Sequence, residues 1–275
     1  MKFSPDENIG PAALAQRYDL KGKLLVHSIF ATWQGEMPFG GRSAIFLRLG
    51  GCNRGGKSFG CLFCDTAFEM RDSKLMSIKD VAIAINTLRT EATELLVVTG
   101  GEPLMQQDAL MKLFELHEYL PNHIQIETNG DFDFKPEHKK AVDWLPFTVV
   151  CSPKAWDRVD KPFKSLALKP ENINFYRFLI SATQPEYMQV PEEILVNCKD
   201  GVEKTVPRTL YLSPMTVYYE NSTKEERNKG WGGTSINVAE TVANYQHSIK
   251  VADDLLKKGY WVRLSSQSHL MYGIA

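Results

Sequence analysis

The chain has 275 residues, of which 43% are hydrophobic and 24% charged, an ordinary composition for a globular protein long enough to bury a large core. Its formal net charge is -1, so no broad basic field favours a nucleic acid as partner, and a small-molecule substrate fits better. No apolar run is long enough to span a bilayer, and the N-terminus lacks the apolar core of a signal peptide. We therefore expect a cytoplasmic protein without membrane contact.

The chain divides into a short N-terminal extension and one larger domain. Residues 1–22 are polar, with a possible short helix over 12–18, and residues 23–275 follow as a single domain. Hydrophobic patterns in this domain alternate between the two periodicities. Predicted strands cover 23–30, 44–49, 95–98, 123–127, 147–151, 174–180, 208–212 and 260–265. Predicted helices cover 78–88, 105–120, 136–144, 185–198 and 235–258. Repeated βα units with near-continuous apolar strands indicate a parallel sheet.

Polar motifs stand directly after the ends of five different strands. They are a cysteine loop and the segments TGGEP, TNG, SPK and SPM. Motifs gathered at the carboxyl ends of many strands are typical of a barrel mouth, whereas a doubly wound sheet concentrates them at one switch point. We therefore predict a partial βα-barrel. Two stretches look inserted, 156–170 and 217–233, and the second is charged and Gly-rich, as expected for a mobile loop or lid near the mouth.

Three cysteines dominate the chemistry of the sequence. Cys52 is followed by eight residues, Cys61, two residues and Cys64. Thiolates are soft metal ligands, but a structural zinc site needs four protein ligands and no fourth follows at finger-like spacing. Three thiolates on a [4Fe–4S] cluster would leave one iron open to a small molecule. A zinc site completed by a distant residue and a redox-active thiol pair remain alternatives. Cys151 and Cys198 lie far away, and we expect them to be buried.

The segments GGCN…CLFCDT, VVTGGEPLMQ, IETNG and VCSPKA, in this order, resemble the radical S-adenosylmethionine (SAM) enzymes. Within that group the chain is most similar to the 7-carboxy-7-deazaguanine synthases, from about Val26 to its last residue. The resemblance implies an incomplete, splayed (β/α)6-type barrel. It also implies a lyase that converts 6-carboxy-5,6,7,8-tetrahydropterin to 7-carboxy-7-deazaguanine with loss of ammonia, in deazapurine biosynthesis of the queuosine type. A glycyl-radical activating enzyme and a zinc-stabilised binding module without turnover are the alternatives.

The resemblance assigns roles to individual residues. It implies that a [4Fe–4S] cluster is held by Cys52, Cys61 and Cys64. Contacts to SAM are implied for Phe63, Gly100, Gly101, Glu102, Ser152, Lys154 and Ser213. Substrate contacts are implied for Gln34, Gly35, Glu36, Arg48, His269 and the terminal carboxylate of Ala275, with Arg48 and His269 as the catalytic pair. The implied Mg²⁺ ligand is Thr66, while Asp65 would orient the loop.

Some of these positions have a competing interpretation or depart from the family pattern. An Arg inside an apolar strand needs a partner anyway, so Arg48 could form a structural ion pair. Ser213 stands where the family often has Gln, Met37 replaces a usual Gly, and Leu270 replaces a usual Lys. For Phe63, loop packing is the alternative. The resemblance further implies a flavodoxin or ferredoxin as electron donor and a homodimer.

Overall fold

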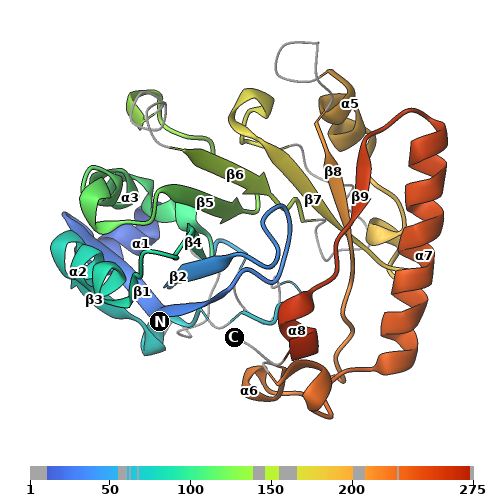
Figure 1. The fold of residues 1–275 in the computed structure, drawn as a ribbon, viewed down its shortest axis with the longest axis horizontal. Coiled ribbons are helices and arrows are strands. Elements are labelled where there is room, and N and C mark those ends of the chain that lie inside the picture. The colour runs from blue at the N-terminus through green and yellow to red at the C-terminus, as the bar shows by residue number, and fades with distance from the viewer. Residues whose placement is uncertain are drawn as a thin grey trace.

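The computed structural model describes residues 11–54, 61, 63–66, 68–138, 146–154, 166–200, 208–227 and 229–272. Their strands form one nine-stranded sheet in the order β3-β1-β2-β4-β5-β6-β7-β8-β9 (Figure 1). The strands are β1 (Lys23–Trp33), β2 (Ser43–Leu49), β3 (Lys74–Ser77), β4 (Leu95–Gly100), β5 (His123–Thr128), β6 (Phe147–Cys151), β7 (Phe175–Ile180), β8 (Leu210–Pro214) and β9 (Val262–Leu264).

The sheet is parallel over most of its width. Every neighbouring pair from β2 to β9 is parallel, whereas β1 pairs antiparallel with both β2 and β3. In the described part of the chain β3 and β9 are the two edges and do not pair with each other, so the curved sheet stays open. The predicted partial, splayed barrel is confirmed.

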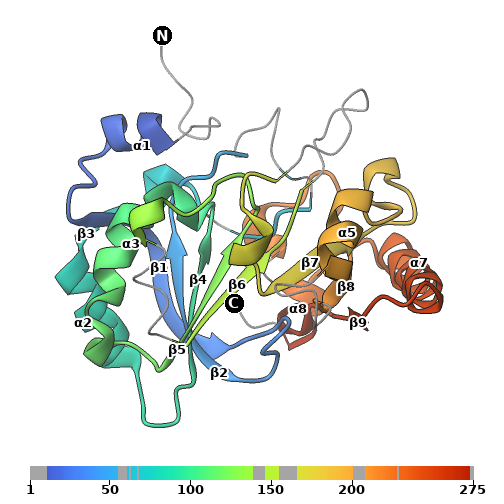
Figure 2. The ribbon, with the colours of Figure 1, turned by 90° about the horizontal axis from the view of Figure 1, so that it is seen from above.

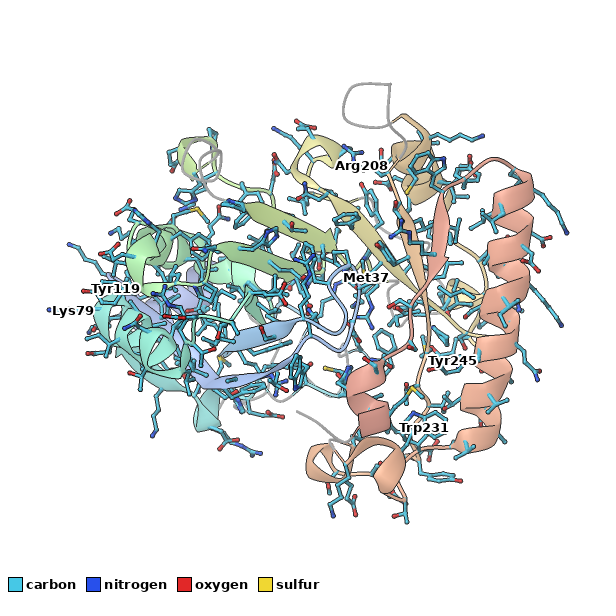
Figure 3. The ribbon with its side chains drawn as sticks, in the orientation of Figure 1. Met37, Lys79, Tyr119, Arg208, Trp231 and Tyr245 are labelled. Atoms are coloured by element: carbon cyan, nitrogen blue, oxygen red, sulfur yellow. The ribbon has the colours of Figure 1, made fainter. Side chains whose placement is uncertain are left out.

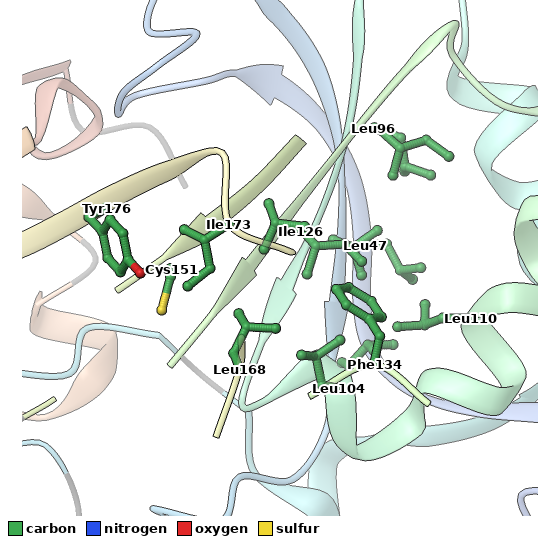
Figure 4. Packing of buried hydrophobic residues seen from close by; sticks show 14 of the residues in the cluster. Leu47, Leu96, Leu104, Leu110, Ile126, Phe134, Cys151, Leu168, Ile173 and Tyr176 are labelled. Atoms are coloured by element: carbon green, nitrogen blue, oxygen red, sulfur yellow. The ribbon is translucent and has the colours of Figure 1, made fainter. Parts of the chain in front are cut away.

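Helices cover the convex face of the sheet (Figure 2). They are α2 (Ile78–Leu88), α3 (Gln107–Phe114), α5 (Glu192–Asp200) and α7 (Val238–Lys257). Helix α1 (Pro11–Arg17) packs in a separate, smaller cluster. The main core lies between these helices and the strands, where Leu47, Leu96 and Ile126 face Leu104 and Leu110 (Figure 4). Strand alternation therefore leaves the other side chains of each strand on the concave face, where a site can form.

Most predicted elements are found, with altered ends. Ser77 caps α2 by accepting a hydrogen bond from the amide of Asp80, and Gly259 follows α7 with φ of 82°. The helix expected over 105–120 is divided into the short 3-10 helices η2 (Pro103–Gln106) and η3 (His117–Tyr119) around α3. Strand β3 and the short helix α8 (Ser268–Tyr272) were not predicted. Parts of the predicted helix 136–144 and of the stretch 156–170 lie outside the described residues.

The first helix is anchored to the barrel. Leu14 of α1 is fully buried and packs with Leu25, Met70 and Met105. The boundary at residue 22 stays a prediction. Within the described residues, no helix combines the length and the apolar composition needed to cross a lipid bilayer.

The stretch 217–233 forms a folded excursion between β8 and α7. A bridge between Tyr218 and Ile236 closes its neck, and it contains α6 (Lys224–Arg227) and the 3-10 helix η6 (Gly230–Gly232). Trp231 lies in η6, beside α8 (Figure 3). Elsewhere in that view Met37 lies near the middle of the barrel, buried against Val150 and Tyr211.

Candidate active site

One cavity opens at the carboxyl ends of the parallel strands. It brings together thirteen of the predicted site residues: Gln34, Glu36, Arg48, Cys52, Cys61, Phe63, Cys64, Thr66, Gly100, Gly101, Ser152, Lys154 and His269. Gly35, Glu102 and Ser213 lie behind its wall, and Ala275 lies outside the described residues. Side chains separated by more than two hundred residues in the chain thus share one concave surface.

The three thiols of the cysteine loop line this cavity together. Within the described residues Cys52, Cys61 and Cys64 form no disulfide, and all three are half-buried. The amide of Cys64 donates to the carbonyl of Cys61 at 3.0 Å, which forms a tight turn. Burial raises the pKa of the Cys52 thiol well above its usual value, and Glu102 and the other two cysteines raise it further. Three thiolates in such a place require a cationic centre to offset their charge. The donor set therefore fits an iron–sulfur cluster.

The glycine corner after β4 lies directly against the cysteine loop. A Cβ on Gly101 would overlap the carbonyl of Gly51, and a Cβ on Gly100, which has φ of 122°, would overlap the backbone of Leu49. The amide of Glu102 donates to the carbonyl of Gly51 at 3.0 Å. Only glycine permits this approach, so the corner brings main-chain groups to the wall beside the cysteines.

Glu102 braces the loops from inside. It is 1% exposed, and its carboxylate accepts hydrogen bonds from the Leu104 amide, the Thr128 hydroxyl and the Asn129 amide at 2.8 to 3.0 Å. Burial raises the pKa of this carboxyl to about 7 against the opposing effect of these donors. Since its hydrogen bonds are internal, Glu102 ties the end of β4 to the end of β5. Its contact with a ligand ammonium stays a prediction.

A buried ion pair that we did not predict locks the cysteine loop to its neighbours. Arg54 and Asp131 form a bidentate pair at 2.6 and 2.8 Å, and both side chains are nearly buried. The same guanidinium donates to the carbonyl of Lys154 at 3.0 Å. Asn53 donates to Asp131 at 2.6 Å. The residues after Cys52 are therefore fixed to the loops that follow both β5 and β6.

Lys154 and Phe63 lie together in the cavity wall. The Lys154 ammonium donates to the Ser152 hydroxyl at 2.5 Å and lies 5.7 Å from the centroid of the Phe63 ring. Burial lowers the pKa of Lys154, and the nearby Cys61 opposes this shift. The other side of Phe63 meets Tyr187 edge-on, with ring centroids 5.5 Å apart. Phe63 therefore packs the loop and still presents a face to the cavity.

A network of carboxylates and their partners forms another part of the cavity lining. Glu36 forms a bidentate pair with Arg177 at 2.6 and 2.7 Å and accepts a hydrogen bond from Gln267 at 3.0 Å. Gln34 donates to Glu127 at 3.1 Å. Burial and the charge of Glu36 raise the pKa of Glu127. The segment containing Gln34 and Glu36 is therefore rigidly held, with hydrogen-bonding groups directed into the cavity.

His269 lies beside the cysteine loop. Its Nε2 is 3.6 Å from the Asp65 carboxylate. Burial alone would raise the pKa of Asp65, but His269 and then Arg177 hold it at about 2. Burial alone would lower the pKa of His269, and the bond to Asp65 raises it instead. The contact between His269 and Asp65 therefore joins α8 to the residue after Cys64. Gly35 packs against His269 so closely that a Cβ would overlap it.

Arg48 lines the cavity and keeps a hydrogen-bond donor that no described residue engages. It lies in β2 opposite Thr99 of β4, and burial lowers its pKa while Asp65, Glu127 and Cys64 oppose the shift. Its Nε is buried without a hydrogen-bond partner among the described residues, and its guanidinium lies 5.1 Å from the Phe30 ring centroid. A guanidinium that faces the cavity in this way can bind a ligand carboxylate.

The sequence argument missed Arg54, Asp131, Arg177 and Gln267. Arg177 carries the same signal that identified Arg48, since both are arginines inside an apolar strand. Ser213 also gains an explanation, because its hydroxyl accepts a hydrogen bond from Arg177 Nε at 3.1 Å. In this chain Ser213 orients Arg177 and does not itself line the cavity.

The sequence was also compared with known protein families and with curated proteins. The model of the radical SAM superfamily matches residues 48–159. The 7-carboxy-7-deazaguanine synthase of Hyperthermus butylicus is 38% identical over 205 residues, which are 70% of this chain and 77% of the relative. The enzyme of the same name from Rickettsia prowazekii is 37% identical over 175 residues, 62% of this chain and 67% of the relative.

The fold also matches that of solved structures. The crystal structure of QueE from Escherichia coli aligns with a TM-score of 0.56 and 21% sequence identity, covering 92% of this chain and 98% of that chain. At this level of identity the likeness concerns the fold alone.

Proposed function

Because the chain belongs to the family of 7-carboxy-7-deazaguanine synthases, which are radical SAM enzymes, we propose the following roles for its cavity. The protein is a radical SAM lyase of deazapurine biosynthesis with a [4Fe–4S] cluster and SAM as cofactors. Its substrate is 6-carboxy-5,6,7,8-tetrahydropterin, and its products are 7-carboxy-7-deazaguanine and ammonia. The observation that supports this best is one cavity whose lining contains the three thiols together with Arg48 and Glu36.

The residues divide between the two ligands. Cys52, Cys61 and Cys64 would hold the cluster, and the chemistry that the reduced cluster and SAM would supply is radical abstraction of hydrogen from the substrate. Phe63, Lys154 and Ser152, with the main chain of Gly100 and Gly101, surround SAM, as their places in the wall allow.

The substrate occupies the remaining space. The segment containing Gln34 and Glu36 holds the amino–oxo edge of the pterin, where donors and acceptors alternate. The unpartnered Nε of Arg48 supports binding of the substrate carboxylate there. His269, which lines the cavity, closes the site. Enclosure matters because a carbon radical must meet no other hydrogen donor.

Magnesium belongs beside the substrate carboxylate. Thr66 lines the cavity next to Asp65, and its hydroxyl lies 3.3 Å from that carboxylate. Mg²⁺ keeps several waters and takes few protein ligands, so one threonine hydroxyl and the substrate can complete its shell. We further propose a flavodoxin or ferredoxin as reductant, a homodimer, and a cytoplasmic location, where thiols stay reduced.

Anaerobic reconstitution tests the reaction. The protein is loaded with iron and sulfide, reduced, and incubated with SAM, Mg²⁺ and the pterin, and the products are identified by mass spectrometry. A product lighter by one ammonia, absent with Cys64→Ala, is expected. An intact pterin with SAM cleaved to 5′-deoxyadenosine would reassign the substrate. Conversion without a protein partner separates this lyase from a glycyl-radical activating enzyme, and zinc without sulfide would indicate a binding module.

A further inference from the structure

The folded excursion 217–233 is pinned at its neck and directed toward the active site. The Val217 amide donates to the Thr241 hydroxyl at 3.1 Å, and the Tyr219 amide donates to the Ser235 carbonyl at 2.9 Å. The first residues of the excursion are thus fixed to the start of α7 and to the residues just before it. A segment held in this way can fix the positions of the elements that it contacts.

Its first contact is with the cysteine loop. Arg227 Nη1 donates to the carbonyl of Cys64 at 3.2 Å. The same guanidinium stacks over Tyr218 with 4.8 Å to the ring centroid. Because Tyr218 lies at the neck and is bridged to Ile236, the position of Arg227 is set by the excursion itself. The carbonyl of the last cysteine is therefore anchored to a segment that begins more than 150 residues later.

Its second contact is with α8. Gly230 is buried with φ of 55°, and a Cβ at this position would overlap the carbonyl of Leu270. Leu270 follows His269 and is 2% exposed. Ser268, which precedes His269, donates from its amide and its hydroxyl to the carbonyl of Gly35 at 2.9 and 2.7 Å. Helix α8 is therefore held between the excursion and the segment containing Gly35.

The third contact closes a triangle. The pair His269–Asp65 and a hydrogen bond from Gln267 to Asp65 at 3.4 Å join α8 directly to the cysteine loop. The cysteine loop, α8 and the excursion thus touch one another pairwise. We propose that the excursion 217–233 is a positioning brace that fixes α8 against the cysteine loop, and so sets the spacing between substrate and cluster. The effect on catalysis rests on the proposed function. The fixing of α8 against the cysteine loop does not depend on it.

The size of the effect follows from the close contact at Gly230. Real Cβ atoms do not approach a carbonyl oxygen this closely, so Ala at 230 must push α8 away by about 1 Å, and the positive φ adds strain. A misplacement of about 1 Å can reduce a rate by about 100-fold. Gly232 offers a matched control in the same short helix, since a Cβ there meets nothing within 4 Å.

The experiment compares Gly230→Ala with Gly232→Ala in the full chain. Hydrogen exchange by mass spectrometry reports the mobility of the peptide that contains α8, with or without cofactors. We expect faster exchange in α8 for Gly230→Ala and wild-type exchange for Gly232→Ala. In the reconstituted enzyme, product formation should fall by about 10- to 100-fold while SAM cleavage continues. The ratio of 5′-deoxyadenosine to product should then rise about 10-fold or more. Iron and sulfide content should not change.

A second variant guards against misfolding. Arg227→Gln removes the charge at the Cys64 carbonyl without adding bulk, and it should raise the same ratio. Unchanged exchange in α8 for both Gly230→Ala and Arg227→Gln would overturn the brace. So would faster exchange with wild-type coupling of SAM cleavage to product. If wild-type protein itself leaves the pterin intact, the proposed function fails, and the exchange data alone decide the brace.

Discussion

Replacing Arg54 by Met should destabilise the protein strongly, because Arg54 neutralises a carboxylate that has little access to water. The Arg54 and Asp131 side chains are 7% and 11% exposed, and their charged atoms are 2.6 Å apart. Removing one partner of a buried pair costs about 3 to 5 kcal/mol, since the remaining charge is left without a partner. The lost hydrogen bond to the Lys154 carbonyl adds about 1 kcal/mol. We expect a total loss of about 4 to 6 kcal/mol in the free energy of unfolding.

A second pair provides the control. Lys135 and Asp108 are also 2.6 Å apart, but their side chains are 46% and 63% exposed. An exposed pair contributes about 0 to 1 kcal/mol, so Lys135→Met should leave stability nearly unchanged. Equal distance with unequal burial isolates the effect of burial. The assay is equilibrium urea unfolding of the reduced, metal-free protein under argon, followed by circular dichroism.

A double variant sharpens the test. In Arg54→Met/Asp131→Leu no buried charge remains, so part of the lost stability should return. The Arg54→Met protein, once reconstituted, should also lose iron to a chelator faster than wild type, because the residues after Cys52 have lost their anchor. A loss below about 1 kcal/mol for Arg54→Met, or a value equal to that of Lys135→Met, would refute the argument.

Four further results are expected. Arg48→Met should raise the KM for the pterin by about 10- to 150-fold, which corresponds to the loss of a hydrogen bond to a charged group. The midpoint of urea unfolding should change little, because Arg48 forms no ion pair within the described residues. Leu14→Ala should cost about 2 to 5 kcal/mol of unfolding free energy, since Leu14 is fully buried; a value near zero would show that α1 is dispensable. Burial raises the pKa of Cys198 to about 12, so mass spectrometry should find it unalkylated by iodoacetamide in native protein at about pH 8. Finally, Arg177→Met and Glu36→Gln should be non-additive in kcat/KM, because they share one ion pair; additive losses would mean that Arg177 does not act through Glu36.

The sequence determined the chemistry and the architecture of this protein. Some features are local, such as the spacing of the three cysteines and the glycines at strand ends. The ligand chemistry of the cysteines and the backbone conformation of the glycines can therefore be recognised in the sequence. Alternating apolar patterns then required a parallel sheet, whose carboxyl ends must lie at one edge. The family resemblance of these motifs implied that the cysteine loop, Gly101 and Lys154 share one site, and the structure places them in one cavity.

The tertiary structure decided which charges meet. Glu36 pairs with Arg177, 141 residues away, and Arg54 pairs with Asp131, 77 residues away. Nothing in the sequence states these partners, because they depend on the curvature of the sheet and on the paths of loops. Burial is also a property of the whole fold, so only the structure showed that the hydrogen bonds of Glu102 are internal while Arg48 keeps an unpartnered Nε. The sequence determines the chemical groups that a side chain carries, and the packing of the fold determines which of these groups are paired and which remain available to a ligand.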